Sequence, residues 1–168
     1  MFKLHDTVMY GTTGVCTVES IENKKIGRDT KQYYVLKPKS QCTSTVFIPI
    51  DNEKLLSKVR KVLSNKEVEL IIDSIDSNTS VWVDNDAERR VRFSEIIQSG
   101  DRKQCLCLLY TLKRHQRLLS EKGKRLHIAD ERALKESERL IYDEFSFALG
   151  VDAERISEYI KKRFEQIY

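Results

Sequence analysis

The residues of this chain that could do chemistry are mainly long cationic side chains. Residues 102–125 hold eight basic residues against one acidic residue, Glu121. A second basic group, Arg89, Arg90 and Arg92, lies in an acidic neighbourhood. Cationic side chains on one side of a rigid element are what phosphate binding requires. These stretches therefore indicate a phosphate-binding face, or else a solvated face that pairs with neighbouring acidic helices.

Trp82 is the only tryptophan, and it lies in a polar stretch just before the arginine group. One interpretation is that it anchors a connector onto a helical core. The other is that it stacks on a base or wedges into distorted DNA beside arginines that bind phosphate. Both interpretations stay open at this point.

Cysteine and histidine patterns favour neither a metal site nor a catalytic site. The cysteines (Cys16, Cys42, Cys105 and Cys107) and the three histidines do not form the paired spacing of a zinc site. No motif brings together a nucleophile, a base and an oxyanion donor. We therefore expect reduced thiols, no metal, no cofactor, no catalytic residue and no enzymatic activity.

The spacing of apolar residues changes near residue 50, from the alternation of strands to the repeat of helices. Residues 6–10, 15–26, 33–36 and 43–48 alternate as short strands between turns, which predicts a small antiparallel β-barrel. From about residue 52 the apolar residues repeat as on helices, with helices predicted over 66–75, 87–98, 101–121, 130–149 and 152–167. The fold class is therefore α+β, a small barrel followed by a compact helical bundle.

The boundaries predicted from these patterns are a β domain over 1–55, a helix and connector over 56–85, and a helical domain over 86–168. No apolar stretch approaches the roughly 20 residues of a membrane span. The N-terminus shows no basic region, apolar region and cleavage site in order. We therefore expect a cytoplasmic protein without a membrane partner.

Several short motifs, in order, resemble the CarD/CdnL family of bacterial transcription regulators. The first lies at Asp6-x-Val8-x-Tyr10-x-x-x-Gly14-Val15, and others follow at 21–22, 33–36 and 46–49. In the helical half the similar positions are 89–90, 99–101 and 130–134. The same barrel occurs in the transcription-repair coupling factor. The helical half favours a stand-alone regulator over the coupling factor, which would continue into a helicase.

For the first half, the resemblance implies a Tudor-like barrel that binds the β subunit of RNA polymerase at a sheet edge. Such β-augmentation uses backbone hydrogen bonds for affinity and alternate side chains for register. The matching edge positions are Lys24, Ile26 and Phe47. Family members often carry a basic residue where this chain has Phe47.

For the helical half, the resemblance implies contact with promoter DNA at the upstream edge of the transcription bubble, largely independent of sequence. Trp82 is the candidate wedge, although it precedes Arg89 by seven residues, against two in some members. The DNA-contact positions carried over are Trp82, Arg89, Arg90, Arg92, Arg114 and Arg132.

The function predicted is that of a transcription regulator that modulates open-complex stability and reaches the nucleoid through RNA polymerase, with no small-molecule substrate. One alternative is a protein adaptor whose helical domain is a scaffold that does not touch DNA. Another is a barrel with an aromatic cage for methylated or RNA ligands, for which Tyr10, Tyr33, Tyr34 and Phe47 supply the aromatic residues.

Overall fold

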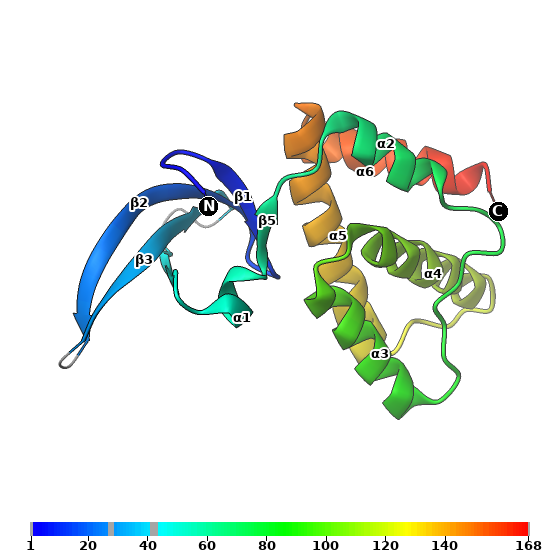
Figure 1. Ribbon diagram of the computed structural model, residues 1–168. Coiled ribbons are helices and arrows are strands. Elements are labelled where there is room, and N and C mark those ends of the chain that lie inside the picture. The colour runs from blue at the N-terminus through cyan, green and yellow to red at the C-terminus, as the bar shows by residue number, and fades with distance from the viewer. Residues whose placement is uncertain (1, 27–28, 41–43, 168) are drawn as a thin grey trace. The chain divides into compact units, whose positions relative to one another are not determined.

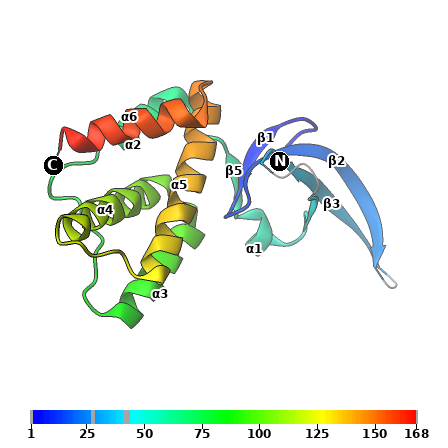
Figure 2. The ribbon, with the colours of Figure 1, turned by 180° about the vertical axis from the view of Figure 1, so that it is seen from behind.

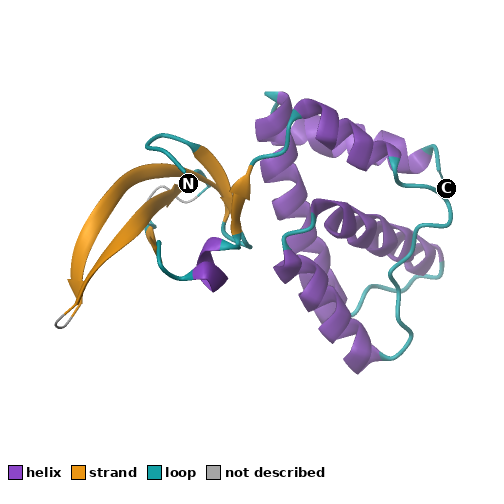
Figure 3. Cartoon of the chain, in the orientation of Figure 1, coloured by secondary structure: helices purple, strands orange, loops and turns teal. Residues whose placement is uncertain are grey.

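The computed structural model describes residues 2–26, 29–40 and 44–167. It divides the chain into two compact units, 1–62 and 63–168. Strands lie in the first unit, and all the helices except the short α1 lie in the second (Figure 1, Figure 3). The α+β class predicted from the change of period is therefore confirmed, with a β unit followed by a helical unit.

The first unit is a five-stranded antiparallel sheet in the order β4-β3-β2-β1-β5. In chain order its elements are β1 (Thr7–Tyr10), β2 (Gly14–Ile26), β3 (Asp29–Pro38), β4 (Val46–Pro49), α1 (Glu53–Leu56) and β5 (Val59–Lys61). The pairing of β2 with β3 shifts register between Val18 and Ser20, a β-bulge. Along β2 the apolar residues first occupy one set of alternate positions and then the other. The bulge causes this change, because one extra residue moves the later side chains to the opposite face.

One face of the sheet carries the main core of this unit. Alternate residues of neighbouring strands meet there, namely Val8, Cys16, Val18, Tyr34, Leu36, Ile48 and Val59. The residues between them point to the other face, because the side-chain period of a strand is two. Phe47 lies on that second face and stays 42% exposed.

The second unit consists of α2 (Asn65–Asp73), α3 (Asp86–Ser99), α4 (Arg102–Glu121), α5 (Ile128–Leu149) and α6 (Ala153–Glu165). The buried stripes of α4 and α5 form its centre, with Leu108, Leu109, Leu140 and Phe145 at or near zero exposure. The helices begin and end at local signals. Ser64 and Glu67 form a capping box for α2. Gly100 and Gly150 end α3 and α5 in the left-handed conformation.

The helices over 87–98, 101–121, 130–149 and 152–167 were predicted from the sequence at nearly their observed positions. Two short elements, α1 and β5, were not predicted. Because β5 pairs with β1, the sheet extends to residue 61 and the first unit ends at 62, whereas the sequence suggested 55. Residues of α2 belong to the helical core, since Val68 and Ile72 pack there. No ladder joins β4 to β5 in the described residues, so the sheet has two edges.

Candidate functional site

The outer edge of β4 offers backbone groups that can bind another strand. The amide of Ile50 donates to the carbonyl of Gln32 at 2.9 Å, which continues the register in which Ile48 pairs with Tyr34. In an antiparallel ladder, residues that face the neighbouring strand alternate with residues that face away. Phe47 and Pro49 therefore direct their backbone groups away from β3. Because proline has no N–H, Phe47 supplies the outward donor of this short edge.

The side chains of two predicted polymerase-binding residues meet beside this edge. The Lys24 ammonium lies over the Phe47 ring, 3.3 Å from its centroid. The two residues come from β2 and β4, which flank β3. A cation over an aromatic face is attracted by the quadrupole of the ring. The structure thus places a positive charge at the ring of Phe47.

A second lysine flanks this pair. Lys24 and Lys31 are direct partners in the register of β2 and β3. Like charges placed opposite each other are unfavourable, and their side chains diverge to separate partners. Lys31 pairs with Asp51 at 2.8 Å, and its hydrogen bond holds the pKa of that carboxyl below the usual value. Ile26, the third predicted contact, ends β2, and its side chain lies outside the described part of the structure.

The aromatic cage suggested by the sequence is divided between the faces of the sheet. Tyr34 belongs to the core cluster, and Tyr10 packs against that cluster. Phe47 lies on the opposite face, since it pairs with Val35, next to Tyr34 on β3. The four aromatic side chains therefore do not surround one ligand.

In the helical unit, Trp82 is held by groups from three elements. The imidazole of His115 on α4 stacks on its ring at 3.6 Å between centroids and 11° between planes. The Arg89 guanidinium from α3 lies over the ring at 4.3 Å, and the ring contacts Phe93 at 6.2 Å. Its indole N–H donates to Asp84 at 3.2 Å in the preceding connector. The half-buried Trp82 thus packs as an anchor for the connector.

The structure corrects the role predicted for Arg89. Its side chain is 5% exposed, and its five N–H donors are all used. They bind both carboxylate oxygens of Asp130, the carboxylate of Asp86, and the carbonyls of Val83 and Asp84. No donor is left for a phosphate. Arg89 joins the start of α3 to the start of α5 and fixes the loop that carries Trp82.

Two members of this cluster, His115 and Asp130, were not predicted as site residues. Both lie more than 30 positions from Trp82 in sequence, and neither has a recognisable local motif. Burial lowers the pKa of His115, and the positive charges of Arg114 and Arg89 lower it further. Asp130 is only 2% exposed. From sequence, an acidic residue in the first turn of α5 indicates only a favourable interaction with the helix dipole, and its pairing with Arg89 is visible only in the fold.

The other predicted DNA-contact arginines lie at the surface. Arg90 and Arg92 are exposed on α3, Arg114 on α4 and Arg132 on α5. Arg92 lies 4.0 Å from Glu95, and Arg114 donates to the carbonyl of Ser77 at 3.1 Å. The start of α3 lies beside the start of α5 in the helical unit (Figure 2), and Arg89 joins both to Trp82, on which His115 of α4 stacks. We call these four arginines the exposed arginine set.

Thiol chemistry has little support among the described cysteines. Burial raises the pKa of the Cys16 and Cys105 thiols to about 11 and also raises that of Cys107. Such thiols stay protonated at neutral pH and are weak nucleophiles. The described ranges contain no group of three or more His, Cys, Asp or Glu side chains arranged for a metal ion, and Cys42 lies outside them.

The sheet with its open edge is the kind of module that binds a partner strand, and comparison with known families gives its class. Residues 2–62 match the family model for the CarD-like/TRCF RID domain. The first unit therefore belongs to this family of RNA-polymerase-interacting domains, which confirms the resemblance over residues 2–62. The match supports RNA polymerase as a partner, and it ends before the helical unit.

Among the residues that the structure describes, no helix combines the length and the apolar character needed to cross a bilayer.

Proposed function

We propose that this protein regulates transcription by joining RNA polymerase to promoter DNA without catalysing a reaction. In this proposal the β4 edge pairs with a strand of the polymerase β subunit. The observation that supports it most is the family match over residues 2–62, together with the outward backbone groups of Phe47. Backbone pairing supplies affinity, and the Lys24–Phe47 pair supplies a charged and aromatic contact beside it.

The proposed DNA contact uses the exposed arginine set rather than Arg89. Those cations can reach phosphates, whereas the Arg89 guanidinium is fully engaged within the fold. Contacts of this kind position a protein on a duplex without reading sequence. Trp82 then supports the connector, and a wedging role would require it to leave His115 and Arg89.

The regulatory step in this proposal is a shift in population. A protein that binds the melted promoter better than the closed one favours opening by its difference in affinity. A difference of about 1–2 kcal/mol changes open-complex occupancy roughly 5- to 30-fold. No sequence reading is then needed, because promoters with unstable open complexes respond most.

A proline substitution tests the edge directly. Phe47→Pro removes the outward N–H of β4 while leaving the hydrogen bonds of Ile48 and Ile50 to β3 in place. We expect it to abolish co-purification with RNA polymerase, whereas Phe47→Ala weakens recovery. Melting curves of the variants confirm that the sheet still folds.

Lys61→Pro is the matched control on the other edge of the sheet. The amide of Gly11 donates to the carbonyl of Lys58, so Arg60 faces β1 and Lys61 directs its N–H outward from β5. Recovery of polymerase should be unchanged in this variant. If Lys61→Pro loses binding and Phe47→Pro keeps it, the partner strand does not pair with β4.

Charge reversal tests the DNA contact and separates it from the adaptor alternative. Arg90→Glu with Arg92→Glu should shorten open-complex lifetime and lower affinity for fork-junction DNA in the polymerase-bound state. The control, Lys66→Glu with Arg155→Glu, makes the same change in charge at exposed positions near the starts of α2 and α6. If both double variants behave like wild type, the helical unit is a scaffold and the adaptor function holds.

A further inference from the structure

A groove between α4, α5 and α6 is lined by apolar and charged side chains, as ligand sites are. Its residues take no part in the proposed polymerase and DNA contacts. Its cavity volume is about 550 Å³, within the range of small-molecule pockets. The floor is apolar, formed by Ile160 and Phe164, which are 1% and 3% exposed. Phe164 packs edge-on against Tyr110 with 5.0 Å between ring centroids, so the floor is part of the rigid helical core.

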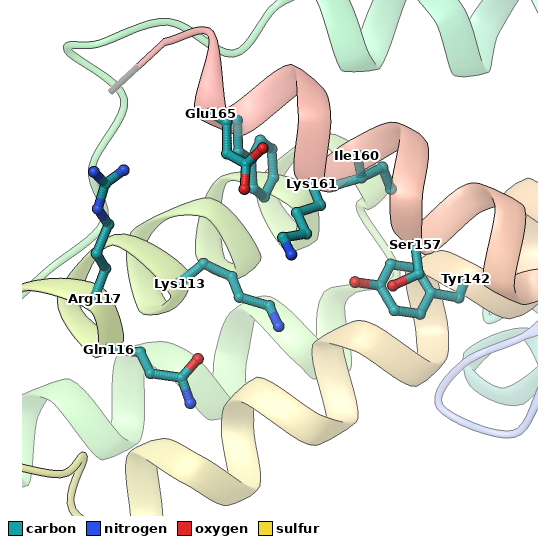
Figure 4. Close-up of a pocket in the computed structure, with 9 residues that line it drawn as sticks. Lys113, Gln116, Arg117, Tyr142, Ser157, Ile160, Lys161 and Glu165 are labelled. Carbon is teal, nitrogen blue, oxygen red and sulfur yellow. The ribbon is translucent and has the colours of Figure 1, made fainter. Parts of the chain in front are cut away.

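Polar groups from three helices meet above this floor. The ammonium groups of Lys113 and Lys161 and the hydroxyl of Tyr142 point into the same space (Figure 4). Tyr142 shares a hydrogen bond with Ser157, and burial raises the pKa of this phenol, which therefore keeps its proton and can donate. Ser157, Ile160, Lys161 and Phe164 follow the i, i+3, i+4 and i+7 spacing of one face of α6.

Among the described residues that line the groove, three are cations, Lys113, Arg117 and Lys161, and one is an acid, Glu165. Lys113 forms an ion pair with Glu138, and Arg117 pairs with Glu121 at 3.4 Å, and neither acid lines the groove. Glu165 is the acidic lining residue among those described. No carboxylate of the described residues lies within ion-pair distance of Lys161, so its charge is available to a ligand.

We propose that this groove binds a small phosphorylated molecule with a flat ring, of the size of a nucleoside diphosphate. The phosphate oxygens accept hydrogen bonds from Lys113, Lys161 and Tyr142, as charge-assisted bonds that are stronger than neutral ones. The ring lies on Ile160 and Phe164. The site bridges α4 and α6, so a bound ligand stabilises the helical unit by binding only its folded form.

The probes that test the site are ADP, adenosine and inorganic pyrophosphate, each titrated without magnesium into the full chain by calorimetry. We expect ADP to bind and to raise the melting temperature, with weaker binding of pyrophosphate and no detectable binding of adenosine. Lys161→Met should weaken ADP binding about tenfold, because it removes the available charge. Lys162→Met is the matched control, since this neighbouring lysine is exposed but does not line the groove.

Two results would overturn the proposal. One is the absence of heat and of a thermal shift with both ADP and pyrophosphate at millimolar concentration. The other is an equal loss of ADP affinity in Lys161→Met and Lys162→Met, which would indicate general electrostatic attraction. Neither result bears on the polymerase or DNA contacts, because no groove residue takes part in them.

Discussion

Two cation–aromatic pairs within the described residues lie in different surroundings. In the first unit, the Lys24 ammonium lies over the exposed ring of Phe47. In the second, the buried Arg89 guanidinium lies over Trp82. Lys24 has side-chain exposure of 38%, so the first pair can meet a partner. All five N–H donors of Arg89 form hydrogen bonds within the helical unit. The same kind of contact is exposed in the first unit and lies within the fold in the second.

The largest expected effect is on the buried pair. Arg89→Met leaves the Asp130 carboxylate buried without its cation, and it should lower the free energy of unfolding by about 3–5 kcal/mol. Urea denaturation monitored by helical circular dichroism measures this change. Arg90→Met, at the exposed neighbouring position, should stay within about 0.5 kcal/mol of wild type. An equal decrease in the free energy of unfolding in the two variants would show that the buried contacts of Arg89 do not stabilise the fold.

The next effect is on polymerase binding through Phe47. Phe47→Ala removes the exposed ring beside the open edge and should weaken affinity about tenfold, or about 1.4 kcal/mol. Its effect on stability should be small, since the side chain lies outside the sheet core. Surface plasmon resonance with immobilised polymerase measures the affinity. An unchanged dissociation constant would contradict a contact at this side chain.

Lys24→Met should have a smaller effect on the same affinity. A single partly exposed charge beside an interface contributes up to about 1 kcal/mol, so we expect a loss of roughly two- to fivefold. The affinities of Lys24→Met, Phe47→Ala and the variant that carries both substitutions together give the coupling energy between the two residues. Additive losses would mean that the pair contacts polymerase as two independent side chains.

The smallest effect concerns the pH dependence of the Trp82 cluster. Burial and two arginines lower the pKa of His115 in the folded state, so the unfolded chain binds the proton more readily. Its contribution to stability is complete above the unfolded pKa of about 6.5 and is lost as pH falls through the lower folded value.

Stability should therefore fall more between pH 7.5 and 5.5 in wild type than in His115→Gln. Emission from Trp82, the only tryptophan, follows unfolding in urea at each pH. Parallel pH profiles in the two proteins would contradict this coupling.

Sequence patterns predicted most of the secondary structure, because helix periodicity and capping residues are local. Asp101, for example, caps α4 by accepting a hydrogen bond from the amide of Gln104, as its position before an amphipathic run indicates. The missed strand β5 has three residues, too few to show an alternating pattern. It exists because β1 offers it a pairing edge.

The sequence by itself determined the α+β class, the helix positions, the uneven distribution of charge and the domain family of the first unit. All of these depend on neighbouring residues or on ordered short motifs. Only the tertiary structure decided which cations are available. Arg89 and Arg90 are adjacent in the chain, yet one is buried against Asp130 and the other exposed, because successive residues on a helix point about 100° apart. The same holds for Lys24 and Phe47, whose contact depends on the pairing of β2 and β4 with β3.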